Sequence, residues 1–461
     1  MSGQSWCTDP KPRPVEYDAD DINAALRGER ELDFRDAVGH GASTAGLAAG
    51  NGRALDSRLY QGVAPEADLI IVKATSEGAA ARGDIPAEPA FTACIDDAID
   101  WAAEKADELE QPAVATWNAG TQWGPIDGTD AINRKVNNVF GPDQPGRLWV
   151  APAGDEGGVP NHAGADYSAG SPAEVTFQLT GDRANPTAWY SGDGPATVTI
   201  ELSDGTRVGP VEPGQSVSAD GISITQYRPG EEFYPWTSTS GDRAVWMMIE
   251  GHRGKSGTIT FAPAGGSGGH IDLYGDLTGP TFLSSSIEFT SSLVPGRITS
   301  LGATTGVIVV GVHVALDSFV AMDDRTVNFS AEGRTGELWH GSPGGPTRDG
   351  RNPIDVTAGG QNLPASVAAD STWSTLPSLQ PRDGEGHYIR FGGTSAAGPI
   401  VVGAVALMFE VNPNLTTEDV RQILHDTAIS DEFTGEVPNP EWGYGKIDIA
   451  AAVEAARAAA P

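Results

Sequence analysis

The chain has little cysteine and little positive charge. Only 2 of its 461 residues are cysteines, Cys7 and Cys94, so a disulfide framework is not expected. Cys94 falls on the apolar face of a predicted helix and is interpreted as a packed thiol. Lysine and arginine together number 29 against 62 aspartates and glutamates, which gives a formal net charge of −33 at pH 7. A surface of this sign repels phosphate backbones and excludes nucleic acid as a partner.

Long apolar segments are also missing. No run of 18 apolar residues occurs, so we expect no membrane span. The first residues, Met-Ser-Gly-Gln-Ser-Trp-Cys, have neither a basic region nor an apolar core and do not predict a signal peptide. We therefore expect a cytoplasmic protein, or a secreted or cell-envelope protein if an N-terminal segment precedes this sequence.

What is present predicts three parts. A length of 461 residues with 39% hydrophobic residues suits two or more units, or one large domain with an insertion. In residues 1–165, the apolar run Leu69–Val72 predicts a buried parallel strand, as do residues 113–117 and 147–151. An amphipathic helix is predicted from apolar residues at helical spacing: Phe91, Cys94, Ile95, Ala98, Ile99 and Ala102. This alternation predicts an α/β fold, a parallel sheet with helices on both faces.

The middle part, residues 166–292, changes period. Apolar residues alternate with polar ones, beginning with Val175, Phe177 and Leu179, and Gly, Pro and Asp turns separate the runs. The pattern predicts an antiparallel β-sandwich or jelly-roll-like domain inserted into the α/β fold. Residues 293–461 return to α/β character. Their predicted elements are a strand at 307–314 and helices at 399–409 and 418–426.

A serine in the last part lies in a sequence that suits nucleophilic catalysis. Gly393-Thr394-Ser395-Ala396-Ala397-Gly398-Pro399 precedes a run of small and aliphatic residues that predicts a buried helix. Ser395 would then lie at a helix N-terminus, where free N–H groups and the helix dipole stabilise a developing negative charge. The alternative is an ordinary N-cap on a core helix.

Of the eight histidines, His40 is the candidate base for Ser395. It lies between two glycines at the start of a stretch rich in alanine and glycine, which predicts a closely packed helix. His40 and Ser395 are about 355 residues apart, so only the fold can bring them together, as is common for catalytic groups.

Both patterns resemble those of the subtilases, the subtilisin-like serine proteases, which carry a histidine in H-G-x-x-x-A-G and a serine in G-T-S-x-A-x-P. The similarity covers roughly residues 20–165 and 295–455. Further segments similar to the family's motifs are Gly62–Lys73, Gly345–Arg351, Asp355–Ala358 and Trp442–Asp448. The resemblance implies a subtilisin-like sheet and an endopeptidase acting on proteins or peptides. In such an enzyme Ser395 attacks the peptide carbonyl, and His40 takes the proton and returns it to the leaving amine.

The resemblance also implies two substrate-binding segments. One resembles the edge that pairs with the substrate backbone and consists of Trp117, Asn118, Ala119 and Gly120. The other resembles the wall of the pocket for the side chain before the scissile bond and consists of Ala151, Pro152, Ala153 and Gly154. For both segments the alternative is an ordinary transition from strand to loop.

Asp155 departs from the family pattern. Most subtilases have an asparagine there, whose amide donates a hydrogen bond to the oxyanion, whereas an ionised aspartate donates none. Losing one such donor costs ~10²–10³ in rate. A protonated Asp155 can still donate. We therefore assign Asp155 to the catalytic site and expect it to be buried, with a raised pKa and an acid-shifted activity optimum.

The triad aspartate of the resembled family is missing from its expected place. Upstream of His40, none of the available aspartates follows an apolar run: Asp9, Asp18, Asp20, Asp21, Asp33 and Asp36. Residues 17–26 predict a surface helix instead. We interpret this as a core strand missing before Met1, which would expose its neighbours as edges and lower the rate by ~10⁴. Ser43 and Gly359 also replace a histidine and a proline that are usual in the family.

Three hypotheses therefore stand. The chain is a serine endopeptidase, a pseudoprotease that keeps the fold for binding or regulation, or a binding protein whose β insert is the working part. The intact serine and histidine motifs favour the first, whereas Asp155 and the missing aspartate favour the second. No cofactor is expected. Calcium sites are common in the resembled family, but no loop here has ligand spacing specific enough to assign one.

The charge predicts a response to salt. If the chain is adapted to a saline habitat, the thermal midpoint of unfolding should rise with added NaCl, because salt screens the self-repulsion of a surface with a net charge of −33. A midpoint that stays flat or falls across a NaCl series would contradict this adaptation.

Overall fold

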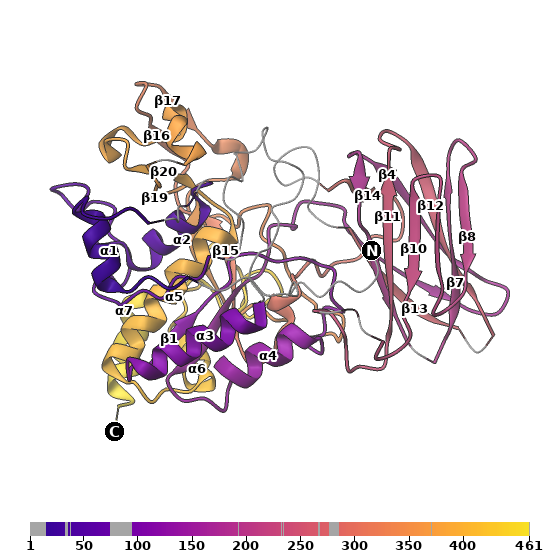
Figure 1. The fold of residues 1–461 in the computed structure, drawn as a ribbon, viewed down its shortest axis with the longest axis horizontal. Coiled ribbons are helices and arrows are strands. Elements are labelled where there is room, and N and C mark those ends of the chain that lie inside the picture. The colour runs from indigo at the N-terminus through magenta and orange to yellow at the C-terminus, as the bar shows by residue number, and fades with distance from the viewer. Residues whose placement is uncertain are drawn as a thin grey trace.

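The computed structural model describes residues 15–32, 36, 38–73, 95–191, 193–231, 233, 235–265, 268–275, 285–369 and 371–460. Figure 1 shows two lobes: one carries the helices, and the other is built of strands from the middle of the chain.

A four-stranded parallel sheet forms the centre of the helical lobe. Its strands, in spatial order, are β1 (Ala113–Ala115), β2 (Arg147–Pro152), β15 (Ile308–Val314) and β18 (Val356–Gln361). β15 is almost entirely buried, as a parallel strand covered on both faces should be. Helices pack on both faces of the sheet, and the α/β prediction is therefore confirmed.

The helices have the bounds α1 (Ala19–Leu26), α2 (His40–Ala49), α3 (Ile95–Glu108), α4 (Ala131–Phe140), α5 (Thr394–Val411), α6 (Thr417–Thr427) and α7 (Ile449–Ala458). The helices predicted at residues 17–26 and 418–426 and after His40 are present, the one predicted at 399–409 begins five residues earlier, and α4 and α7 were not predicted. α1 buries no residue, as expected of a surface helix. Thr416 caps α6 in a reciprocal capping box with Asp419. Phe91, Cys94 and Cys7 lie outside the described residues.

α5 is the central helix of the lobe. By length and composition alone it is apolar enough to cross a membrane, yet 61% of it is buried inside the fold. It packs against the sheet on one side and against α2 on the other. A Cβ added to Gly403 would lie 2.7 Å from the carbonyl oxygen of Ala48, so this close approach of α2 to α5 requires a glycine.

The middle of the chain forms two antiparallel sheets. One has the order β3-β13-β6-β11-β10-β9, with β5 paired to β11, and the other has the order β14-β4-β12-β7-β8. The strands are β3 (His162–Tyr167), β4 (Ala173–Leu179), β5 (Arg183–Ala184), β6 (Thr187–Tyr190), β7 (Ala196–Leu202), β8 (Arg207–Val211), β9 (Ser216–Ala219), β10 (Ile222–Gln226), β11 (Arg243–Glu250), β12 (Ser256–Pro263), β13 (Gly269–Tyr274) and β14 (Ile287–Phe289).

The alternating pattern has the predicted orientation in these sheets. Val175, Phe177 and Leu179 of β4 are buried, whereas the alternating residues Glu174 and Thr176 are exposed. Buried residues of both sheets form one core, which makes the unit a β-sandwich. β3 already belongs to it, so the sandwich starts at His162. The division of the chain into residues 1–165, 166–292 and 293–461 otherwise stays a prediction.

Two short hairpins complete the fold. They are β16 (Ser318–Val320) with β17 (Thr326–Asn328), and β19 (Leu363–Ser366) with β20 (Tyr388–Phe391). The second hairpin packs against α2, and Phe391 and Ala365 share a small apolar core with Leu47 of α2 and Ala396 of α5.

One predicted strand is wrong. Leu69–Val72 has no strand assignment in the structure, and Leu69, Ile71 and Val72 are 54%, 55% and 39% exposed. β1 pairs only with β2 and is therefore an edge of the described sheet. An apolar run becomes a buried strand only when a neighbouring strand accepts its hydrogen bonds, and the described residues supply none here.

Aromatic rings and one arginine join the sandwich to the helical lobe. Trp123 meets Trp236 and Trp246 edge to face, with centroids 5.1 and 4.9 Å apart. Arg348, in the loop before β18, donates to Asp242 Oδ2 at 2.6 Å and Asp272 Oδ2 at 2.9 Å, both in the sandwich. Although burial alone would raise it, the pKa of Asp272 is held well below its usual value by hydrogen bonds from two histidines and by the Arg348 charge.

Truncating Arg348 should therefore destabilise the protein. Its side chain is 13% exposed and those of Asp127, Asp242 and Asp272 are 8%, 17% and 12% exposed, so Arg348→Ala removes the cation that these three nearly buried carboxylates share. We expect the free energy of unfolding in urea to fall by about 3–5 kcal/mol. Arg325→Ala is the matched control, because Arg325 pairs with Asp323 on the surface at 68% exposure, and it should change stability little. Equal effects of the two substitutions would contradict the prediction.

Candidate active site

His40 and Ser395 meet between two helix N-termini. His40 is the first residue of α2, Ser395 lies in the first turn of α5, and His40 Nε2 is 3.1 Å from Ser395 Oγ. This is hydrogen-bonding distance for a base that takes the proton of a serine. The fold thus brings together the two residues that the sequence placed in separate motifs.

The N-terminus of α5 is fixed by a side chain at the end of β18 and by a side chain of its own first turn. Gln361 Oε1, at the end of β18, accepts a hydrogen bond from Gly393 N at 2.6 Å. Thr394 Oγ1 donates to the carbonyl of Gly154 at 3.0 Å. The backbone N–H of Ser395 is one of the first in the helix and has no intrahelical acceptor. It is therefore a ready donor to an oxyanion formed at Ser395.

His40 is enclosed by aromatic rings. The centroid of its imidazole is 5.1 Å from that of Phe391 at an interplanar angle of 79°, and 6.1 Å from that of Trp373. Burial lowers the pKa of His40 below 6.5, and the nearby carboxylate of Asp36 opposes this shift. His40 is therefore neutral at pH 7 and able to accept a proton.

Asp36 is the carboxylate that acts on His40, but it does not hold the ring. Its Oδ1 accepts from Gly39 N at 2.8 Å, and its Oδ2 accepts from Ala42 N at 2.8 Å. Both oxygens thus cap α2, and within the described part of the chain no carboxylate hydrogen-bonded to His40 Nδ1 is recorded. Of the other upstream candidates, Asp18 caps α1, Asp20 and Asp21 lie on α1, and Asp9 and Asp33 fall outside the described residues.

Asp155 lies against the N-terminus of α5. Its Oδ1 accepts from Thr394 N at 2.8 Å and from Thr394 Oγ1 at 3.1 Å. Burial raises the pKa of Asp155 to about 6, although the hydrogen bonds from Thr394 lower it. The expected rise in pKa is present, although Asp155 is only partly buried and not fully buried as expected. Its role as a donor to the oxyanion stays a prediction.

The segment predicted as the substrate edge follows β1 and reaches both catalytic helices. Asn118 Nδ2 donates to Thr44 Oγ1 of α2 at 2.8 Å and to the carbonyl of Ser395 at 2.6 Å. Ala119 and Gly120 are exposed, and Trp117 is partly buried. Asn118 therefore ties α2 to α5, while the next two residues remain accessible to a ligand.

The segment predicted as the pocket wall lies at the end of β2. Ala151, Pro152, Ala153 and Gly154 are buried, and Gly154 N donates to Thr394 Oγ1 at 3.3 Å. Both predicted segments therefore follow the carboxyl ends of parallel strands and flank the N-terminus of α5, which is where α/β sheets bind ligands.

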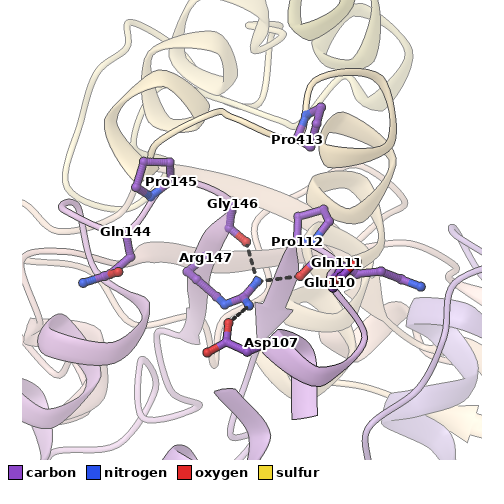
Figure 2. Close-up of a pocket in the computed structure, with 9 residues that line it drawn as sticks. All are labelled: Asp107, Glu110, Gln111, Pro112, Gln144, Pro145, Gly146, Arg147 and Pro413. Carbon is purple, nitrogen blue, oxygen red and sulfur yellow. Dashed lines mark hydrogen bonds and ion pairs between the residues drawn. The ribbon is translucent and has the colours of Figure 1, made fainter. Parts of the chain in front are cut away.

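A surface pocket at the other end of these strands is a separate feature. Arg147 lies at its centre, donating to the carbonyl of Gln111 at 2.7 Å and pairing with Asp107 (Figure 2). Gln111 precedes β1 and Arg147 begins β2, so this pocket lies at the amino ends of the strands. It holds none of the predicted site residues.

The described residues contain no group of three or more His, Cys, Asp or Glu side chains arranged to hold a metal ion. The arrangement at Ser395 consists of a hydroxyl, a neutral imidazole and hydrogen-bond donors, which are groups that acyl transfer uses.

Sequence reasoning missed several residues around the site. Gln361 and Phe391 have no local signature, because their contacts with Gly393 and His40 arise only in the folded chain. Thr394 lies inside the Gly-Thr-Ser motif, so that motif could have identified it as a residue of the site. Ser43, where the family usually has a histidine, is fully buried and donates to the carbonyl of Ser366 at 2.8 Å.

The profile of the subtilase family matches residues 15–445, which is most of the chain. The chain belongs to the subtilase family. The match includes the His40 and Ser395 motifs and also the β-sandwich between them.

Curated relatives of this subtilase are similar over limited segments. It is 30% identical over 152 residues to the serine protease AprX of Bacillus subtilis, covering 33% of this chain and 30% of that protein. It is 35% identical over 100 residues to the halolysin-like extracellular serine protease Nep of Natrialba magadii, covering 22% and 15%. The chain thus spans less than a third of the length of these relatives.

A solved structure matches nearly the whole subtilase fold. The CspB protease of Clostridium perfringens superposes with a TM-score of 0.70 over 96% of this chain and 85% of that chain, at 20% identity. At this identity the match shows a common fold.

The protonation of Asp155 predicts the pH profile of this subtilase. As the pH increases, kcat/KM should first rise, because His40 loses its proton at a pH below 6.5 and becomes a base. It should then fall, because Asp155 loses its proton near pH 6 and an ionised Asp155 cannot donate a hydrogen bond. The profile measured with a peptide substrate should therefore have an acidic optimum. Asp155→Asn, whose amide donates at every pH, should remove the alkaline limb.

Asp130→Asn is the matched control for this profile. Asp130 is also buried with a pKa raised to about 7, but it caps α4 through Asn133 N. Its substitution should leave the alkaline limb in place. Wild-type activity that rises steadily into alkaline pH would overturn the proposed role of Asp155.

Proposed function

We propose that this chain is a serine endopeptidase that hydrolyses peptide bonds in proteins or peptides. The observation that carries the proposal is the 3.1 Å contact between His40 Nε2 and Ser395 Oγ at the N-termini of two packed helices. Membership of the subtilase family, whose named relatives include serine proteases, supports the same activity.

The proposed reaction uses the described groups in sequence. Ser395 Oγ attacks the carbonyl carbon of the scissile bond, while His40 Nε2 takes the hydroxyl proton. The Ser395 N–H and a protonated Asp155 donate to the oxyanion. His40 then gives its proton to the leaving amine as the C–N bond breaks. Water next attacks the acyl carbon while His40 takes its proton, and His40 returns that proton to Ser395 Oγ as the ester bond breaks.

Two segments are proposed to hold the substrate. Trp117–Gly120 continues the chain beyond β1, and its exposed end at Ala119 and Gly120 suits pairing with an extended peptide. Ala151–Gly154 is buried beside Thr394 and suits the wall against which the side chain before the scissile bond rests.

One observation favours a second candidate, a pseudoprotease that keeps the fold for binding. Asp36 influences His40 electrostatically, but both its oxygens are used to cap α2. A histidine without a hydrogen-bonded carboxylate loses the group that fixes its tautomer, which costs ~10⁴ in rate in a serine protease. A low turnover that still depends on Ser395 separates an impaired enzyme from an inactive one.

Covalent labelling tests the nucleophile directly. A fluorophosphonate should label the folded chain on Ser395, as mapped by mass spectrometry, and Ser395→Ala should abolish both the labelling and peptide hydrolysis. Ser330→Ala is the control, because Ser330 is an exposed serine outside the site. Labelling that persists in Ser395→Ala would refute the assignment. A folded wild type that is neither labelled nor active would establish the pseudoprotease instead.

A further inference from the structure

The chain enters the helix of the nucleophile through two glycines. Gly392 and Gly393 directly precede Thr394 and Ser395, and Gly393 is the N-cap of α5 with a φ of 74°. Glycine has the widest backbone freedom of all residues, and it has no side chain that could anchor the chain locally. The position of the Ser395 hydroxyl therefore depends on contacts that other parts of the fold make with this backbone.

One side-chain amide holds the second glycine. Gln361 is 3% exposed, and its Oε1 accepts the N–H of Gly393 at 2.6 Å. The amide lies directly against the glycine pair, since a Cβ added to Gly392 would collide with the same oxygen. The next N–H along the chain, that of Thr394, donates to Asp155 at 2.8 Å. Gln361 and Asp155 thus fix two successive peptide groups immediately before the nucleophile.

The orientation of the Gln361 amide is set by Glu332. Glu332 ends a short 3₁₀ helix, η2 (Ser330–Glu332), and its Oε2 accepts from Gln361 Nε2. The N–H of Gly393 is a donor and the carboxylate is an acceptor, so only one orientation of the amide pairs correctly at both ends. Turning the amide over would place its NH₂ group against the N–H of Gly393 and its oxygen against the carboxylate. Glu332 therefore excludes the orientation that cannot hold Gly393.

Arg390 fixes Glu332 in turn. Its Nη2 donates to Glu332 Oε1 at 2.6 Å, and its Nε donates to Asn362 Oδ1 at 2.6 Å. Its guanidinium also lies 4.4 Å from the ring centroid of Phe329. The side chains of Arg390 and Glu332 are 23% and 24% exposed, so solvent screens this ion pair only in part. The carboxylate consequently has one fixed place, from which it reaches Gln361.

We infer that Glu332 is a positioning residue for Ser395, acting through Gln361 and the backbone of Gly393. The inference rests on the proposed role of Ser395 as a nucleophile and adds a residue that acts at a distance from the reacting atoms. When the carboxylate is removed, the buried Nε2 of Gln361 loses its acceptor, and the amide is free to turn away from Gly393. The glycine pair then has more than one backbone position, and Ser395 Oγ departs from its 3.1 Å contact with His40.

Inactivation by a fluorophosphonate tests this arrangement without a peptide substrate. In Glu332→Leu the limiting rate constant of inactivation should fall by about 10–100-fold, as expected for a reacting group misplaced by about 1 Å. The reagent concentration that gives half of the limiting rate should not change. Glu332→Gln keeps one oxygen that can accept from Gln361 and should lose less. Glu337→Leu is the matched control, because Glu337 is 28% exposed and pairs with Arg334 at the surface, and it should react at the wild-type rate.

A double-mutant cycle separates positioning from a general loss of stability. Gln361→Leu alone should also slow inactivation. Because Glu332 acts through Gln361, the double variant Glu332→Leu/Gln361→Leu should react as slowly as Gln361→Leu and no more slowly. A thermal unfolding curve for each variant confirms that it is folded. Effects that multiply in the double variant, a wild-type rate in Glu332→Leu, or an equal loss in Glu337→Leu would overturn the inference.

Hydrogen exchange keeps the two proposals distinguishable. Mass spectrometry with electron-transfer fragmentation should show the N–H of Gly393 exchanging about 2–10-fold faster in Glu332→Leu, the range for one lost hydrogen bond. In Glu337→Leu its exchange should not change. If the fluorophosphonate does not label the folded wild type, the nucleophilic role of Ser395 fails, and exchange at Gly393 alone decides whether Glu332 holds the start of α5. If the wild type is labelled and Glu332→Leu changes neither exchange nor inactivation, the role of Glu332 fails and the endopeptidase stands.

Discussion

The contact between His40 and Ser395 depends on how closely α2 and α5 approach each other. A helix N-terminus is needed at both positions, and the two can meet only where the facing surfaces carry little bulk. Gly403 on α5 supplies that space against the carbonyl of Ala48 on α2. Asn118 then joins the helices at their starts by bonding to Thr44 and to Ser395. The catalytic geometry is thus a consequence of helix packing.

The packing that encloses the site also sets the protonation states of His40 and Asp155. Enclosure lowers the pKa of His40 and raises that of Asp155 to about 6, so both groups are driven toward their neutral forms. A neutral imidazole accepts the serine proton, and a neutral carboxyl donates to an oxyanion. If Asp155 donates to the oxyanion as proposed, the two neutral forms are needed together, and one physical cause, burial, favours both.

The sequence was most informative where a pattern reflects a local requirement. The apolar period of 2 in β4 predicted the sandwich, because the burial of alternate residues is decided within a few residues of the chain. The strand predicted at Leu69–Val72 is absent because a strand needs a neighbouring strand to pair with, and the described residues supply none. In the site, motifs identified His40 and Ser395, but the contacts of Gln361 and Phe391 are made only by the tertiary fold.

The absence of a carboxylate on His40 Nδ1 in the described structure changes what must hold the ring. Position and plane are set here by α2, whose N-terminus Asp36 caps, and by the rings of Phe391 and Trp373. Packing of this kind restrains where the ring lies, but it does not choose which nitrogen carries the proton. A carboxylate does both, since it accepts from only one tautomer. The site therefore holds the His40 ring close to Ser395, but it lacks the group that prepares the ring for proton transfer. Proton transfer is the property in which an enzyme and a binding protein with the same fold would differ.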